Sequence, residues 1–267
     1  MNNINCVLGI SSLYNKLPGY FIEKFLTVEQ KRFDRYIPLD KDTIFHSDMF
    51  LVDEDFLGSL DKLGAFDMIA RYHIRRFSFD IGTCFKKVKV IDNKFFGLGR
   101  RLSLKEIYEL CEKKIDCLRR RLPRFCEIAV ENSNYYDTGA YEDVCEPAFY
   151  RDIHKKFGLG LVFDIAHARV SAINKKTDLH QYLEGFDSSA MSEFHISKAK
   201  LIAKDQAVDF HEVPDTEEFQ ILWEIVRKRK GKCDVVIEYW KNADAVIDAY
   251  KKMEEFFDEK DKNHTAA

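Results

Sequence analysis

The feature of this sequence that most constrains its fold is a repeated alternation between short apolar runs and longer amphipathic segments. In the second half, apolar runs at 125–131, 160–164, 191–197 and 234–240 are each followed by a segment with helical periodicity. Each run has the length of a strand buried on both faces, and the segments between them have the length of one helix. This order predicts a mainly parallel sheet covered by helices.

The helical segments carry recognisable end signals. Ser103 and Glu106 form the pattern of a capping box, and Pro123 ends the helix that begins there. A second helix is expected between about 141 and 156, with Gly158 as its stop. Further helices are expected around 178–183, over 216–231 and over 243–254.

The first half is less regular but contains the same kinds of element. Strands are expected at 6–11, 43–48 and 75–81, with a helix between the last two. The segment 86–99 has the pattern of a β-hairpin that turns at Asp92 and the following asparagine.

Length and apolar content favour one large domain. Six to eight strand–helix units fit within 267 residues, of which 46% are hydrophobic. A closed barrel suits this number of units better than an open sheet. We therefore expect an α/β fold, a single-domain (β/α)8 TIM barrel over 1–257, followed by a polar and frayed C-terminal tail at 258–267.

Composition argues against several kinds of partner. The formal net charge is −3 with both signs interspersed, which predicts neither a nucleic-acid nor a membrane partner. No apolar run approaches the roughly 18 residues of a membrane-spanning helix, and the first residues do not form a signal-peptide pattern, so a cytoplasmic location is expected. The seven scattered cysteines are expected to be free thiols.

Acidic and imidazole side chains stand at the ends of the expected strands. In the second half these are Glu131, Asp164, His195 and Glu238, and in the first half they are His46 and Asp80. Because the carboxyl ends of parallel barrel strands open on one face, these residues converge without being close in sequence. That face is where barrel enzymes keep their active sites.

Two short spacings extend the set. His167 follows Asp164 by three residues, in the turn expected after the strand, and His211 follows Asp209 by two, which places both on one side of an extended segment. The complete set of expected metal ligands is His46, Asp80, Glu131, Asp164, His167, His195, Asp209, His211 and Glu238. Nine nitrogen and oxygen donors without a thiolate suit two or three iron, manganese or zinc ions.

A single acid at a strand end is more often a helix cap than a ligand, so the prediction depends on the joint pattern. Four histidines fall outside it and are interpreted as bystanders: His73, His154, His180 and His264. The sequence has no phosphate-binding loop and no nucleophile elbow, which argues against a nucleotide-binding protein of that type and a serine hydrolase.

These motifs resemble the MbnB and TglH family of multinuclear non-haem iron enzymes, which have a xylose-isomerase-like TIM-barrel fold. The resemblance covers 125–240 and includes FDIAHARVSAIN, EFHIS, the pair Asp209 and His211, and VIEYW. The ligand order is also similar to the endonuclease IV-like branch, whose members bind zinc and cut DNA. The stretch 170–183 and the near-neutral charge favour the MbnB-like branch.

The resemblance implies an O2-dependent oxygenase or oxidase with two or three iron ions. It implies that the substrate is a cysteine of a ribosomally synthesised precursor peptide, and that a partner protein binds the leader peptide. No residue is identified as catalytic beyond the ligands. Two positions depart from the family pattern: Asp80 stands where a second early histidine is usual, and Trp240 stands where many relatives have an acid.

Two other functions remain open. One is a zinc- or manganese-dependent sugar isomerase, epimerase or phosphodiesterase on the same barrel, for which metal identity and oxygen consumption are the discriminating measurements. The other is a degenerate barrel that only binds a partner.

Overall fold

The computed structural model describes residues 4–265, with side chains to residue 262. Within this range, eight parallel strands close into a barrel in the order β1-β12-β9-β8-β7-β4-β3-β2. The strands are β1 (Ile4–Gly9), β2 (Thr27–Gln30), β3 (Asp42–Phe50), β4 (Arg76–Asp80), β7 (Glu127–Glu131), β8 (Gly160–Asp164), β9 (Met191–Ile196) and β12 (Cys233–Ile237). The expected single-domain (β/α)8 barrel is confirmed.

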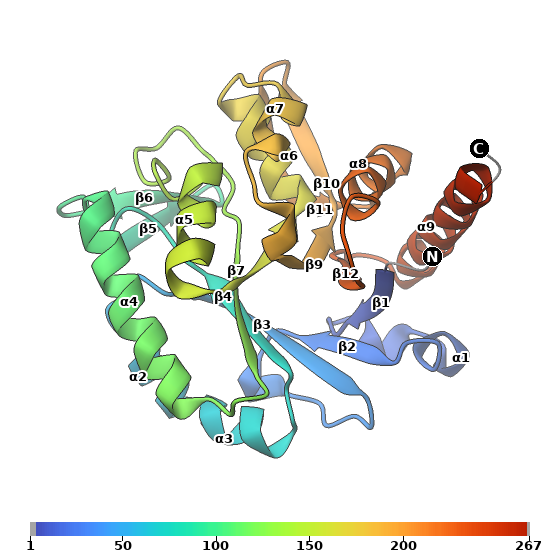
Figure 1. Cartoon of the computed structure of the whole chain (residues 1–267), viewed down its shortest axis with the longest axis horizontal. Coiled ribbons are helices and arrows are strands. Elements are labelled where there is room, and N and C mark those ends of the chain that lie inside the picture. Colours follow the sequence, from blue (N-terminus) through green and yellow to red (C-terminus); the bar gives the residue numbers. More distant parts are fainter. Residues whose placement is uncertain (1–3, 266–267) are drawn as a thin grey trace.

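Helices surround the strands (Figure 1). They are α1 (Gly19–Ile22), α2 (Phe56–Lys62), α3 (Ala65–Arg71), α4 (Leu104–Arg121), α5 (Pro147–Phe157), α6 (Ile165–Asn174), α7 (Leu179–Glu184), α8 (Thr216–Val226) and α9 (Ala243–Thr265). The capping box of Ser103 and Glu106 starts α4 as predicted, and Gly158 ends α5 in the left-handed conformation. The main apolar core lies between these helices and the barrel strands.

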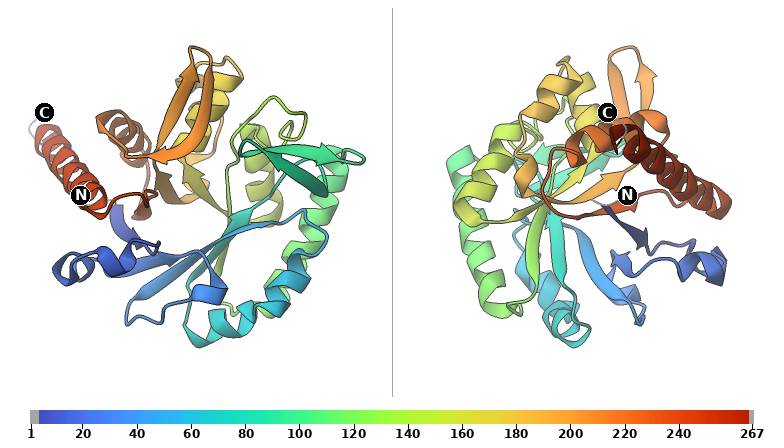
Figure 2. Two further views of the ribbon diagram at one scale, coloured as in Figure 1. Left: turned by 180° about the vertical axis from the view of Figure 1, so that it is seen from behind. Right: turned by 45° about the vertical axis from the view of Figure 1, so that its right-hand side comes forward.

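Two β-hairpins project from the barrel (Figure 2). The first, β5 (Lys87–Ile91) and β6 (Lys94–Leu98), turns at Asp92 and Asn93, which both have positive φ, as the sequence predicts. The second, β10 (Lys198–Ala203) and β11 (Gln206–Glu212), follows β9 directly and was not predicted as a hairpin.

Three sequence-based expectations need correction. Helix α6 begins immediately after β8, so His167 lies in its first turn and not in a connecting turn. The short strand β2 was not predicted, because four residues of mixed polarity carry little periodic signal. Helix α9 continues through the segment expected to be a frayed tail as far as Thr265, while residues 266–267 lie outside the described part.

Strand register brings four of the expected ligands into neighbouring pairs. Asp80 at the end of β4 is the register partner of Glu131 at the end of β7. Asp164 at the end of β8 is the register partner of His195 in β9. Adjacent strands are about 4.8 Å apart, so inward-facing members of such pairs meet inside the barrel.

The barrel closes where the first and last strands meet. Val7 of β1 and Ile237 of β12 are both bound by Tyr250 of α9, whose hydroxyl donates to the Val7 carbonyl and accepts the Ile237 N–H at 3.1 Å. The tyrosine is buried, so water does not replace these bonds. Helix α9 therefore fixes the seam of the barrel.

Replacing Tyr250 with phenylalanine leaves the two buried backbone groups without their partner. We expect Tyr250→Phe to lower the free energy of unfolding by about 1–3 kcal/mol, measured by urea denaturation. Tyr20 is 67% exposed, so Tyr20→Phe serves as the matched control and is expected to change little. Equal losses in both variants would contradict this role of Tyr250.

Candidate metal centre

The nine residues selected from the sequence gather at the carboxyl ends of the barrel strands. Seven come from barrel strands, their ends or the first turn of α6, while Asp209 and His211 come from β11. Six of the nine line one cavity of about 540 Å3: His46, Asp80, Glu131, His167, His211 and Glu238. Asp164 and His195 lie deeper and are fully buried.

Glu131 lies at the centre of the group. One of its oxygens is 2.6 Å from Nδ1 of His195, and the other is 3.6 Å from Nε2 of His46 and 3.7 Å from Nδ1 of His167. Burial raises the pKa of Glu131, but these imidazoles outweigh it and hold the pKa well below its usual value. The carboxylate is therefore kept ionised at the bottom of the cavity.

Two clusters share Glu131. In each, one possible ligand atom per residue lies within 4.8 Å of the others: His46, Asp80 and Glu131 in the first, and Glu131, Asp164, His195 and Glu238 in the second. A carboxylate common to two clusters could contribute a ligand atom to an ion in each.

A third cluster lies on the hairpin side of the mouth. The two oxygens of Asp209 lie 3.2 Å from Nε2 of His167 and 3.2 Å from Nδ1 of His211. Nε2 of His211 also lies 3.1 Å from Glu238, which connects this cluster to the second. His211 has a φ of 46°, an unfavourable backbone conformation for a residue other than glycine that often marks a functional position.

The imidazoles of His167 and His46 are each held by a hydrogen bond at Nδ1 that leaves Nε2 facing a carboxylate of the site. Nδ1 of His167 lies 2.8 Å from the carbonyl oxygen of Asn132, which leaves Nε2 directed at Asp209. Nδ1 of His46 lies 3.0 Å from the Ser78 hydroxyl, which leaves Nε2 toward Glu131. Such contacts fix the tautomer and the ring orientation of metal-binding histidines.

Asn132 also joins two barrel strands. Its side-chain amide donates to the Asp164 carbonyl at 3.0 Å, and its side-chain oxygen accepts the Asp164 N–H at 2.7 Å. The residue is completely buried beside Glu131. It therefore sets the position of Asp164 as well as the orientation of His167.

Asp164 combines the two roles that an acid at a strand end can have. One oxygen accepts the His167 N–H at 2.6 Å and caps α6. The other is buried and has no hydrogen-bond partner in the described part of the chain. Burial raises the pKa of Asp164 to about 6. A buried carboxylate oxygen without a donor is a fitting ligand for a cation.

Sequence reasoning missed several residues of the site. Glu29 and Glu193 are buried beneath His195, with carboxylate oxygens 2.8 Å and 3.1 Å from its Nε2. Glu193 precedes His195 by two residues in a strand, a spacing that predicts the same face. Glu29 lies on the unpredicted β2, and Lys31, just after β2, forms an ion pair with Glu238.

The remaining histidines lie away from this centre. His73 stacks against Phe125, His154 contacts the Leu159 carbonyl, and His180 is exposed. The side chain of His264 lies outside the described residues.

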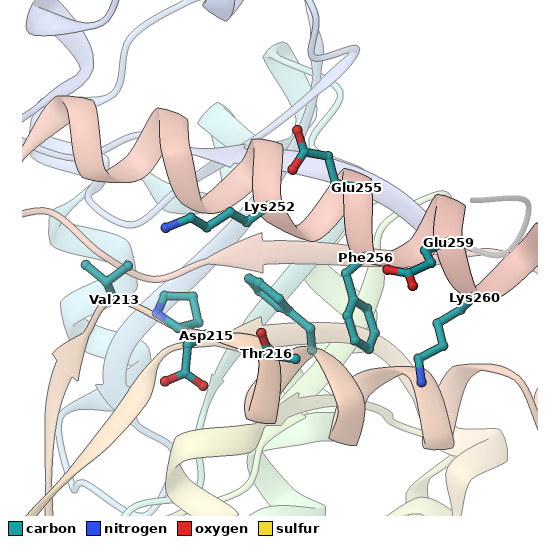
Figure 3. Close-up of a pocket in the computed structure, with 10 residues that line it drawn as sticks. Val213, Asp215, Thr216, Lys252, Glu255, Phe256, Glu259 and Lys260 are labelled. Atoms are coloured by element: carbon teal, nitrogen blue, oxygen red, sulfur yellow. The ribbon is translucent and has the colours of Figure 1, made fainter.

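A second large groove lies between the start of α8 and α9 (Figure 3). Its lining includes Asp215, Phe256 and Lys260 but no histidine. The nearby acids Asp215 and Glu218 form the capping box of α8, which accounts for their proximity. This groove therefore lacks the donor set of the barrel mouth.

The charges of the centre predict a pH dependence for the metal-free protein. Burial lowers the pKa of His167 and His195, but nearby carboxylates outweigh it and raise both well above 6.5. Their stabilising contribution is therefore complete below pH 6.5 and is lost as the pH rises through the raised values. We expect the Tm of metal-free protein to fall above pH 6.5.

Thermal denaturation with and without bound metal checks this expectation. Metal binding displaces protons, so the loaded protein is expected not to show the same decline. His195→Gln is expected to flatten the metal-free profile, whereas the exposed-site control His180→Gln retains it. Parallel profiles for wild-type and His195→Gln would contradict the assignment.

Comparisons with known proteins identify relatives of this chain and of its fold. A curated relative, a UPF0276 protein of Psychromonas ingrahamii, is 31% identical over 71 residues, which are 27% of this chain and 25% of the relative, so the match spans a quarter of that protein.

Among the described residues, no helix has the length and apolar composition needed to cross a membrane.

Solved structures share the fold at low sequence identity. A xylose isomerase domain protein of Alicyclobacillus acidocaldarius has a TM-score of 0.61 at 12% identity, covering 95% of this chain and 98% of its own. The 3-keto-D-glucoside 4-epimerase YcjR of E. coli has a TM-score of 0.57 at 12% identity, covering 95% and 100%. The family model described as "RiPP precursor modification enzyme MbnB/TglH/ChrH" matches residues 103–258, and the chain therefore belongs to the MbnB/TglH/ChrH family.

Proposed function

We propose that this protein is an O2-dependent multinuclear iron oxygenase or oxidase that modifies a cysteine of a ribosomally synthesised precursor peptide. The observation that carries the proposal is the sharing of Glu131 between two buried clusters of histidine and carboxylate groups, with a third cluster beside them. Membership of the MbnB/TglH/ChrH family supports peptide modification as the biological role. A leader-peptide-binding partner protein is part of the same proposal.

The three clusters divide the nine residues among up to three ions. The first ion would be held by His46, Asp80 and Glu131, the second by Glu131, Asp164, His195 and Glu238, and the third by His167, Asp209 and His211. The donor set is nitrogen and oxygen only, which suits iron and also suits zinc and manganese. The unpartnered buried oxygen of Asp164 fits a cation in the second cluster.

Iron held here would supply the redox chemistry with O2 that protein side chains do not provide. The residues of the protein would hold the ions and orient the ligand side chains. Asn132 and Ser78 fix the rings of His167 and His46, while Glu131 remains ionised among the imidazoles. The cavity of about 540 Å3 above the clusters has room for a peptide side chain.

The departures from the family pattern have structural consequences. Asp80 lies in the first cluster, and burial together with Glu131 raises its pKa well above the usual value. A bound cation would favour its ionised form, so Asp80 can replace the expected imidazole. Trp240 packs against the ring of His211, with the centroids 4.4 Å apart, and carries no proton-transfer group.

A zinc- or manganese-dependent isomerase, epimerase or phosphodiesterase is the alternative. It remains open because the donor set does not discriminate between these metals and iron. Such an enzyme would act without oxygen, so metal identity and oxygen consumption separate the two functions.

The sharing of Glu131 predicts graded losses of metal. We expect Glu131→Gln to reduce bound iron by two or more ions per chain, because two clusters lose a ligand. Asp209→Asn removes a ligand from the third cluster only and is expected to cost one ion. Plasma mass spectrometry of protein purified without oxygen measures both.

The control is Glu217→Gln, which changes an exposed acid in the first turn of α8. It is expected to retain the full metal content. Equal metal loss in Glu131→Gln and Glu217→Gln, or no metal after reconstitution with iron, zinc or manganese, would refute the proposed centre.

Oxygen consumption tests the reaction class. Iron-loaded protein is expected to consume O2 when a cysteine-containing precursor peptide from its own gene neighbourhood is added, and not when the cysteine is replaced by serine. Asp164→Asn is expected to lower the rate by at least about tenfold, since it removes a ligand of the second cluster. Full activity of zinc-loaded protein without oxygen would support the alternative.

A further inference from the structure

The cavity above the metal centre has a second wall that the proposed ligands do not form. Three basic residues, Lys31, Arg32 and Arg35, lie in this wall, and Asp48 is its one acid. All three basic residues come from the short segment that follows β2. Apart from the ligands, the cavity therefore carries an excess of positive charge.

Lys31 is the residue of this wall that contacts a proposed ligand. Its ammonium forms an ion pair with one oxygen of Glu238, and its side chain remains 27% exposed. An ammonium group has three N–H donors, so the ion pair leaves donors available to a ligand in the cavity.

The two arginines differ in whether their guanidinium groups are free to bind a ligand. Arg32 donates to both oxygens of Asp34, at 2.9 Å and 2.7 Å, so its guanidinium is already engaged. The side chain of Arg35 is exposed, and its guanidinium makes no hydrogen bond or ion pair within the described part of the chain. Its planar guanidinium suits a carboxylate, which it can bind through two parallel hydrogen bonds.

An apolar surface accompanies these cations. Ile10, Ile37 and Trp240 also line the cavity. A ligand that complements both the basic and the apolar residues has an apolar or backbone portion and a carboxylate. The carboxylate lies close to the ligand group that binds the metals.

We infer that Lys31 and Arg35 bind a carboxylate of the substrate peptide located next to the reacting cysteine. The inference rests on the proposed function and adds a specificity determinant to it. The carboxylate is either the C-terminus of the peptide or the side chain of a neighbouring acidic residue. Ionised carboxylates are recognised through charge-assisted hydrogen bonds in both cases.

Binding of small thiols to zinc-loaded protein tests this inference, because zinc does not undergo redox chemistry and the thiol remains intact. Titration calorimetry compares N-acetylcysteine with N-acetylcysteinamide, which differ in the terminal carboxylate. A second pair, acetyl-Cys-Asp-amide and acetyl-Cys-Asn-amide, differs in a side-chain carboxylate. We expect one carboxylate probe to bind about tenfold more tightly than its uncharged partner.

Arg35→Gln is expected to reduce that preference to less than about threefold, with binding of the uncharged probe changed by less than twofold. Lys31→Gln is expected to reduce the preference to the same extent, and because Lys31 also pairs with Glu238, only the ratio of the two affinities is compared in this variant. The control, Arg71→Gln, makes the same charge change at the end of α3 and is expected to retain the preference. The preferred pair identifies the source of the carboxylate.

Equal binding of both members of each pair to wild-type protein would overturn the inference while leaving thiol binding, and so the proposed function, intact. A preference that survives in both variants would also overturn it. If no thiol binds to the loaded protein, the proposed function fails and the inference fails with it.

Discussion

The structure depends on one buried interaction, the placement of the Glu131 carboxylate among three imidazoles. His195 at 2.6 Å and the more distant His46 and His167 come from three different elements. A buried carboxylate is costly unless it is compensated, so these groups must be held together by the fold. Strand register contributes to this arrangement, since Asp80 pairs with Glu131. Asn132 contributes as well, because its hydrogen bonds with Asp164 join the ends of β7 and β8.

The barrel interior contains a network of buried charged side chains as well as packed apolar residues. Below the metal centre, Arg76 is buried against Asp234 at 2.6 Å and Glu193 at 3.2 Å, and Glu193 in turn contacts Nε2 of His195 at 3.1 Å. Glu29 approaches the same nitrogen. Replacing such networks with apolar residues is often neutral or stabilising, so stability alone does not account for them. Their position beneath His195 fits the support of a proposed metal ligand.

Particular residues show what the sequence predicts and what it does not. Glu131, Asp164 and Glu238 could be found because each ends a clear apolar run, and a parallel barrel places such ends on one face. Glu29 and Lys31 could not, because β2 is short and polar. His167 was selected from its spacing and lies at the barrel mouth, but it belongs to α6, since Asp164 both ends β8 and caps the helix. The position of His211 depends on a hairpin and a positive φ that periodicity does not reveal.

Anomalous diffraction at the iron edge, from crystals of protein purified and loaded with iron without oxygen, tests the central claim most directly. The account predicts peaks within coordination distance of Glu131 and Asp164, and a third peak beside Asp209 and His211, at about 2.0–2.3 Å from nitrogen and oxygen ligands. Peaks at other places on the protein, with the buried clusters occupied only by hydrogen-bonded side chains, would contradict it.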